Sequence, residues 1–193
     1  MALDVVILGP PGAGKGTQAR LIAADAGIPH IATGEMLRDA IAAETPLGEE
    51  VRHVVSRGDL VGDELMIEVI RERLAQPDTA DGFVLDGFPR TLRQAEALDR
   101  MLGETDRGEP SIVLHFQIPE ELAEKRLVGR GHEEGRTDDA PDVIRHRIEV
   151  QRVPDSLIEY YRNKGILVGV HADRTVDDVF AEVQEVLDTA AAR

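Results

Sequence analysis

A glycine-rich loop near the start of the chain constrains the fold more than any other feature. The loop spans residues 9–17, with the sequence Gly-Pro-Pro-Gly-Ala-Gly-Lys-Gly-Thr, and it follows the apolar run at 5–8. A helix-like stretch at 18–24 comes directly after it. A buried strand, a glycine-rich turn and a helix start form a cradle in which backbone N–H groups and the helix dipole attract an anion. The sequence therefore predicts a phosphate-binding site here.

Lys15 indicates which phosphates the loop binds. In the phosphate-binding P-loop, a lysine reaches the outer phosphates of a nucleotide, and a Ser or Thr directly after it binds Mg²⁺. Here Gly16 stands between Lys15 and Thr17, so the loop is a variant of that pattern. By itself the loop predicts a nucleoside triphosphate site, which ATPases, GTPases and kinases share.

Short apolar runs alternate with helical patterns along the rest of the chain. We expect strands at residues 5–8, 29–32, 82–87, 112–117 and 166–170. We expect helices at 15–27, from 33, at 45–58, 62–76, 91–102, 119–130, from 141 to a break before 154, and at 175–190. Strands that alternate with helices favour a parallel sheet covered on both faces. The predicted fold is a three-layer α/β fold, with residues 1–193 as a single domain.

Local signals refine this prediction. Thr33 and Thr45 are candidate N-caps, and Pro46 suits the first turn of a helix. Residues 131–135 are polar, flanked by glycine and without periodicity, which predicts a mobile loop. Residues 33–76 are then a helical excursion between two strands.

Charge and cysteine content exclude several classes of function. The formal net charge of -15 argues against nucleic acid or an anionic membrane as a partner, because both require a basic patch. The chain has no cysteines, which removes disulfides, thiol catalysis and cysteine-based zinc sites. The first residues carry no positive charge, and the apolar run after them is too short for a signal peptide or a membrane span. We therefore expect a cytoplasmic protein, and we expect it to be a monomer.

Several strings downstream of the loop carry further chemistry. They are Thr-Gly-Glu-Met-Leu-Arg at 33–38, Gly-Asp-Leu-Val-Gly-Asp-Glu-Leu at 58–65, Asp-Gly-Phe-Pro-Arg-Thr at 86–91 and Gly-Arg-Thr-Asp-Asp at 135–139, with Arg126, Arg130 and Arg147 nearby. Together with the variant loop, these strings resemble the adenylate kinase family of nucleoside monophosphate kinases, in the same order from residue 5 to about 171. The resemblance implies a P-loop core of five parallel strands, a helical monophosphate-binding insertion at about 33–62 and a short lid at about 130–140.

The resemblance also implies a reaction, ATP + AMP ⇌ 2 ADP with Mg²⁺, and a set of site residues. It implies that ATP is bound by Gly12, Ala13, Gly14, Lys15, Gly16, Thr17 and Arg126. It implies that AMP is bound by Thr33, Arg38, Leu60, Val61, Gly87, Arg90, Gln94, Arg136 and Arg147. The implied catalytic residues are Lys15, Arg90, Arg126, Arg130, Arg136 and Arg147, and the implied metal residues are Thr17 and, through water, Asp86. The segment between Arg130 and Arg136 is too short for the family's longer lid and its zinc ligands, so we expect no structural zinc.

Two of these residues have a second interpretation. Gln94 stands three residues after Thr91, the spacing of a capping box, whereas the resemblance has its amide bind the AMP base. Thr33 is either a helix N-cap or, by the resemblance, a contact of the adenine base.

The chain departs from the family's pattern at three places. Glu35 replaces the usual Asp, Gly62 replaces the usual Pro, and residues 151–156 lack the family's tyrosine and Thr-x-Pro segment. The near alternative is a UMP/CMP kinase, whose members tend to have Ala at the position of Thr33. The distant alternative is a nucleotide-binding switch, but Asn-Lys-Gly-Ile at 163–166 lacks the Asp of a GTPase base-reading motif.

Overall fold

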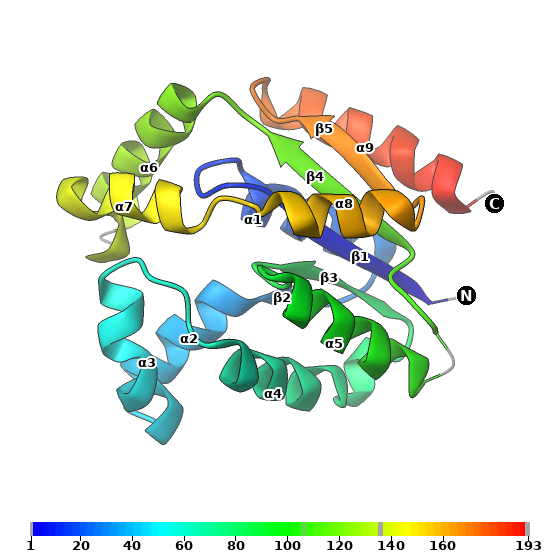
Figure 1. The fold of residues 1–193 in the computed structure, drawn as a ribbon. Coiled ribbons are helices and arrows are strands. Elements are labelled where there is room, and N and C mark those ends of the chain that lie inside the picture. Colours follow the sequence, from blue (N-terminus) through cyan, green and yellow to red (C-terminus); the bar gives the residue numbers. More distant parts are fainter. Residues whose placement is uncertain (1, 106, 135–136, 192–193) are drawn as a thin grey trace.

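Parallel strands form the centre of the structure, a computed structural model that describes residues 2–105, 107–134 and 137–191 (Figure 1). Within these ranges one sheet has five strands in the order β2-β3-β1-β4-β5, and all neighbours are parallel. The strands are β1 (Leu3–Leu8), β2 (His30–Ala32), β3 (Gly82–Asp86), β4 (Ile112–Gln117) and β5 (Leu167–His171). Each lies within two residues of its expected bounds, so the predicted parallel sheet is confirmed.

Helices connect the strands and cover both faces of the sheet (Figure 1). Those that follow the first two strands are α1 (Lys15–Ala26), α2 (Thr33–Ala42), α3 (Pro46–Ser56) and α4 (Asp63–Leu74), with a 3₁₀ turn η1 (Pro77–Thr79). The later ones are α5 (Leu92–Gly103), α6 (Glu120–Glu134), α7 (Pro141–Val150), α8 (Asp155–Asn163) and α9 (Val176–Ala191), with a 3₁₀ turn η2 (Thr137–Asp139) before α7. None of the helices in the described residues is both long and apolar enough to cross a membrane.

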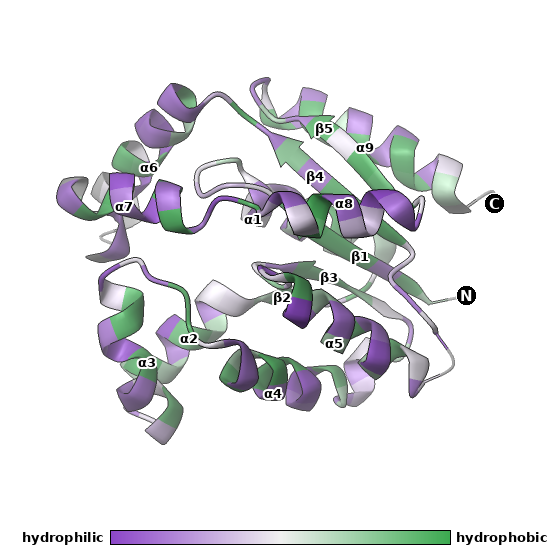
Figure 2. Ribbon diagram, in the orientation of Figure 1, coloured by the Kyte–Doolittle hydropathy of each residue, from purple (hydrophilic) through white to green (hydrophobic). Residues whose placement is uncertain are grey.

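Strand β1 shows why the sheet lies between two helical layers. Val5 and Ile7 belong to the cluster that includes residues of α1 and α9, whereas Val6 and Leu8 belong to the cluster that includes residues of α5 and α8. All four side chains are almost completely buried. A strand buried on both faces reads as a continuous apolar run, as expected for the centre of a parallel sheet. Figure 2 shows the same contrast, with apolar colour along β1 and mixed colour on the outer helices.

Two helical pairs extend beyond the ends to which the strands point (Figure 1). Helices α2 and α3 contact one another below this edge, and α6 and α7 contact one another above it. The second pair has a small core of its own, formed by Leu127, Ile144 and Ile148. Ligands of parallel α/β sheets bind at the carboxyl ends of the strands, so the helical pairs flank the region where a ligand is expected.

Four local predictions have clear outcomes. Thr45 caps α3, because its hydroxyl accepts a hydrogen bond from the N–H of Gly48 at 3.1 Å. Thr33 as an N-cap is wrong, because α2 begins at Thr33 itself and its cap position is Ala32. The loop at 131–135 is also wrong over its described part, because α6 continues to Glu134. The predicted break before Pro154 is confirmed by the gap between α7 and α8.

Candidate functional site

The glycine-rich loop runs from the end of β1 to the first residue of α1. Gly12 has φ +82°, and a Cβ at this position would lie 2.5 Å from the Ala123 carbonyl oxygen, so glycine is required there. Lys15 begins α1, and its Nζ donates to the Pro10 carbonyl oxygen at 2.9 Å. Ala13 is buried in the core beneath the loop. The loop therefore presents backbone and the Lys15 ammonium to the cleft above it.

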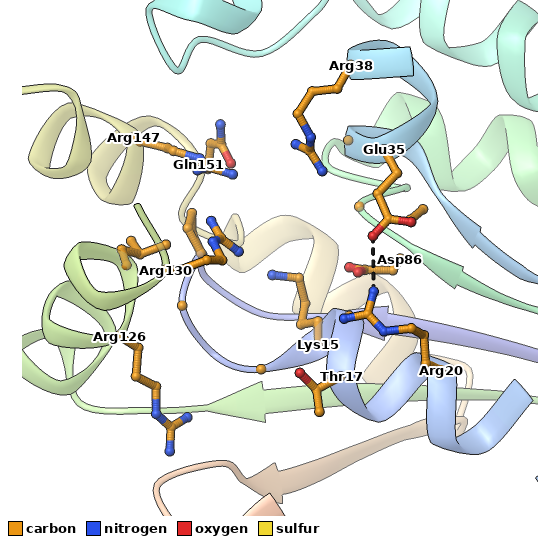
Figure 3. Close-up of a pocket in the computed structure, with 18 of the residues that line it drawn as sticks. Lys15, Thr17, Arg20, Glu35, Arg38, Asp86, Arg126, Arg130, Arg147 and Gln151 are labelled. Atoms are coloured by element: carbon orange, nitrogen blue, oxygen red, sulfur yellow. Dashed lines mark hydrogen bonds and ion pairs between the residues drawn. The ribbon is translucent and has the colours of Figure 1, made fainter. Parts of the chain in front are cut away.

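A polar cleft opens over this loop (Figure 3). Among the predicted residues, its lining includes Gly12, Gly14, Lys15, Gly16, Thr17, Arg38, Asp86, Gly87, Arg90, Arg126, Arg130 and Arg147. In Figure 3 the side chains of Lys15, Arg38 and Arg130 point toward one another from α1, α2 and α6. Residues from distant parts of the chain thus gather positive charge at the carboxyl end of the sheet.

Asp86 ends β3 and faces the start of α1. A Cβ at Gly16 would lie 3.4 Å from Asp86 Oδ2, so the extra glycine of the variant loop leaves room for this carboxylate. Burial by itself would raise the pKa of the Asp86 carboxyl, but neighbouring His30, Lys15 and Arg90 outweigh it and hold that pKa below its ordinary value. Asp86 is therefore ionised at neutral pH.

For Lys15, burial outweighs the attraction of the neighbouring carboxylate. Burial lowers the pKa of its ammonium to about 8, with Asp86 opposing this and Arg90, Arg147 and Arg130 adding to it. A cation that has lost hydration and lies among other cations gains much from a bound anion. The electrostatics of the cleft thus favour a polyanionic ligand.

A second, smaller cavity adjoins the cleft on the side of α2 and α3. Predicted residues Thr33, Arg38, Leu60, Val61, Gly87, Arg90, Gln94 and Arg147 line it. The Thr33 hydroxyl donates to the Asp86 carbonyl oxygen at 3.3 Å. Gly87 has φ +89°, and a Cβ there would lie 2.3 Å from Thr33 Oγ1, so only glycine lets the chain pass this hydroxyl. Of the residues named for this side, Arg136 alone lies outside the described residues.

Gln94 makes part of the predicted capping contact. The Thr91 hydroxyl accepts from the Gln94 N–H at 3.2 Å, which confirms Thr91 as the N-cap of α5. The Gln94 side chain accepts from the N–H of Arg90 at 2.7 Å instead of Thr91, and its Nε2 donates to Asp63 at 2.8 Å. An amide has two donor hydrogens and two acceptor lone pairs. The capping interaction and a contact with a base are thus compatible.

Two adjacent carboxylates hold one arginine of α6, Arg130, and one of α7, Arg147. Asp139 accepts from Arg130 Nε at 2.6 Å and Nη2 at 2.9 Å, and from Arg147 Nη1 at 2.5 Å. Asp138 lies 2.9 Å from Arg147 and 3.9 Å from Arg38. Burial lowers the pKa of the Arg147 guanidinium, and both aspartates oppose that shift. These carboxylates fix Arg147 where it lines both cavities and Arg130 where it lines the first.

Arg90 is held differently. Its Nε donates to the Gly87 carbonyl oxygen at 2.9 Å, and its Nη1 donates to Gln151 Oε1 at 3.0 Å. It forms no ion pair with any carboxylate in the described part of the chain. Burial lowers its pKa to about 10, which Asp86 opposes and Arg147 reinforces, so it remains a cation at neutral pH. Arg90 is thus a desolvated cation held by two neutral acceptors.

Arg126 lies on the far side of the glycine-rich loop. Its Nη1 donates to the Ala172 carbonyl oxygen at 2.9 Å, just after β5. A Cβ added at Gly14 would lie 3.9 Å from Arg126 Nη1, so this guanidinium lies close to the loop. In Figure 3 this side chain points away from Lys15 and Arg130. If the phosphates of a ligand lie in the loop, Arg126 is placed to contact the part of that ligand that extends out of the loop.

Comparison with known proteins identifies the family. A family model described as "Adenylate kinase" matches residues 7–166. The chain belongs to the adenylate kinase family. An adenylate kinase of Thermus thermophilus is 47% identical over 184 residues, which cover 95% of this chain and 96% of that protein. One of Mycobacteroides abscessus is 47% identical over 187 residues, covering 96% and 99%, and one of Archaeoglobus fulgidus is 39% identical over 214 residues, covering 96% and 98%.

Sequence reasoning about this adenylate kinase family member missed several residues of the site. Arg20 and Glu35 form an ion pair at 3.1 Å beside the cleft, and Gln151 reaches both cavities. Asp138 and Asp139 end the Gly-Arg-Thr-Asp-Asp string, which by itself assigns no role to either carboxylate. One feature of the sequence could have indicated Gln151. It follows Arg147 by four residues, and this spacing places both residues on one face of a helix.

Proposed function

We propose that this chain catalyses the reversible transfer of the terminal phosphoryl group of ATP to AMP, giving two ADP. Membership of the adenylate kinase family supports this. The observation that carries it is that two cavities share a wall. Gly87, Arg90 and Arg147 line both of them, so a group bound in one lies next to a group bound in the other. Two nucleotides that exchange a phosphoryl group require this adjacency.

The reaction requires that the two nucleotides are positioned and that the negative charge on the transferred phosphoryl group is stabilised. The attacking atom is a phosphate oxygen of AMP, which is already anionic, so no side chain has to remove a proton. The phosphoryl group in transit spreads negative charge over its oxygens, and preorganised cations stabilise it. Planar guanidinium groups bind two such oxygens at once. Arg90 and Arg147 are proposed to do this at the shared wall, with Arg130 and Arg136 contributing from the lid.

ATP is assigned to the cleft over the glycine-rich loop. Backbone N–H groups of 12–17 bind its phosphates, Lys15 bridges the outer ones, and Arg126 stacks on the base. Mg²⁺ prefers oxygen ligands and keeps several waters. The Thr17 hydroxyl and the ionised Asp86 carboxylate lie in this cleft and fit such an ion. When bound with ATP, Mg²⁺ supplies neutralisation of phosphate charge.

AMP is assigned to the second cavity. Arg38 and Arg90 bind its phosphate, with Arg136 and Arg147 completing the grip, while Thr33, Leu60, Val61 and Gln94 surround its base. Gln94 retains one amide hydrogen and one lone pair beyond its contacts with Asp63 and Arg90. That pair of groups matches the acceptor N1 and the donor N6 of adenine.

Larger-scale features complete the proposal. A monophosphate-binding insertion at about 33–62 and a short lid at about 130–140 close over the nucleotides and exclude water, which would otherwise accept the phosphoryl group. The chain acts as a cytoplasmic monomer, without structural zinc.

One assay tests the reaction and the acceptor together. ADP formation from ATP and Mg²⁺ is measured with AMP, CMP, UMP and GMP in turn, and AMP is expected to accelerate ATP loss most. Absence of acceleration by every monophosphate would refute the kinase reaction, and a preference for UMP or CMP would refute the acceptor assignment.

Arg90→Ala tests the shared wall. It is expected to raise the KM for AMP by roughly a hundredfold, since a charged hydrogen bond is lost in a desolvated site, and to change the KM for ATP far less. Arg145→Ala is the control, because that side chain lies on α7 but is 86% exposed. Equal effects of Arg90→Ala on both KM values would contradict the assignment.

A further inference from the structure

Gln151 joins three parts of the chain that are far apart in sequence. Its Oε1 accepts from Arg90 Nη1 at 3.0 Å, and its Nε2 donates to the Gly58 carbonyl oxygen at 2.8 Å. Gln151 itself is the C-cap residue of α7, and only 9% of it is exposed. The two partners fix the orientation of the amide, because a guanidinium can only donate and a carbonyl can only accept.

The contact with Arg90 orients a cation without neutralising it. Arg130 and Arg147 are held by aspartates, whereas the acceptors of Arg90 are the Gly87 carbonyl and the Gln151 amide. A carboxylate in place of this amide would cancel part of the charge that an incoming phosphate needs. The neutral amide keeps the guanidinium in place and adds no negative charge that would compete with the ligand.

The contact with Gly58 ties the same amide to the opposite wall of the second cavity. Gly58 lies between α3 and α4, shortly before Leu60 and Val61, which line that cavity. A Cβ at Gly58 would lie 3.1 Å from Arg147 Cβ, so this loop packs closely on α7. Gln151 therefore links the loop assigned to the acceptor base with the arginine assigned to the acceptor phosphate.

We propose that Gln151 is a positioning residue for the acceptor: it holds Arg90 in the orientation that binds the monophosphate and fastens the 57–62 loop to α7 over the base. This rests on the proposed phosphoryl transfer to AMP. Gln151 also lines the donor cleft, but its two side-chain contacts lead to the acceptor side. Its loss is therefore expected to affect AMP much more than ATP.

Two substitutions separate positioning from simple packing. Gln151→Met keeps the length of the side chain and removes both hydrogen bonds, and it is expected to raise the KM for AMP about tenfold while changing the KM for ATP less than about twofold. Gln151→Glu keeps the shape and the acceptor for Arg90, but its charge competes with the monophosphate and faces the Gly58 carbonyl. It is expected to raise the KM for AMP by roughly a hundredfold, more than Gln151→Met does.

The order of the two variants decides the question. If Gln151 only fills space, both variants should keep the KM for AMP near that of the wild type, because their side chains have nearly the same volume, and any loss of activity should follow the melting temperature. Melting temperatures are measured for both variants and for Gln76→Met, an exposed control that should match the wild type. If Gln151→Met fails to fold, Gln151→Glu alone decides.

The results distinguish the two proposals. A wild-type KM for AMP in Gln151→Glu, or equal changes in the KM values for AMP and ATP in either variant, would overturn the role of Gln151 and leave the reaction intact. A wild-type chain that consumes no ATP with any monophosphate would instead overturn the proposed function.

Discussion

Lys15 is expected to take up a proton when ATP binds above neutral pH. Its pKa in the free protein is lowered to about 8 by burial, with Arg90, Arg147 and Arg130 adding to the shift and Asp86 opposing it. A bound triphosphate places several negative charges near the ammonium, which favours the protonated form. Binding should therefore return the pKa toward or above its ordinary value of 10.5.

The size of the effect follows from this shift. At pH 8.5 about three quarters of the free protein has neutral Lys15, so binding takes up roughly 0.7 proton per ATP. At pH 7 only about a tenth is neutral, and the uptake falls to roughly 0.1 proton. Because the complex binds more protons than its free components, the affinity for ATP falls as the pH rises above 8.

Isothermal titration calorimetry measures the uptake directly. ATP with Mg²⁺ is titrated at pH 8.5 in two buffers with different ionisation enthalpies, and the difference between the observed enthalpies gives the number of protons. Lys125→Met is the matched control, since Lys125 is exposed on α6, and it should retain the uptake. Equal enthalpies in both buffers at pH 8.5 would refute the electrostatic account of Lys15.

Two further predictions concern the arginines. Asp139→Asn removes the carboxylate shared by Arg130 and Arg147 and should lower the free energy of unfolding by about 3 kcal/mol. An unchanged midpoint in urea would contradict this. Arg126→Ala should raise the KM for ATP several-fold and leave the KM for AMP unchanged, because Arg126 lines only the donor cleft. Steady-state assays with each nucleotide varied would show whether the effect is one-sided.

The sheet was predictable because its strands are short apolar runs, and those of β1, β3 and β4 are buried over most of their length. The tendency of such a run to form a strand hardly depends on distant partners, so the pattern indicated where the strands lie. The helices between them indicated that the strands are parallel. The end of α6 was not predictable in this way. Gly131 resembles a helix stop, but a Cβ there would lie 2.8 Å from the Asp139 carbonyl oxygen. This glycine permits close packing of η2 against the helix, a tertiary requirement that a local pattern does not reveal.

The residues of the candidate site also fall into two groups, those that a local sequence pattern indicates and those that only the tertiary structure shows. Residues within compact motifs, such as Lys15 and Asp86, were named from the sequence, and the structure places them in one cleft. Gln151 was missed because its partners are 61 and 93 residues away. A hydrogen bond between distant loops leaves no local periodicity to find. The roles of the named residues in binding stay predictions until nucleotides are tested.

The contrast between Arg90 and the two arginines held by Asp139, Arg130 and Arg147, explains how an acidic chain can bind two polyanions. A carboxylate such as Asp139 weakens the net field of Arg130 and Arg147, yet it holds their side chains, so little conformational entropy remains to be lost on binding. Arg147 Nε is buried without a partner among the described residues, which leaves it a donor for an incoming oxygen. Arg90 is oriented by neutral groups, so no carboxylate among the described residues pairs with it directly, and Asp86 acts on it only at longer range. The acceptor phosphate is therefore expected to meet the strongest attraction at Arg90, while Arg130 and Arg147 supply fixed geometry for the group in transit.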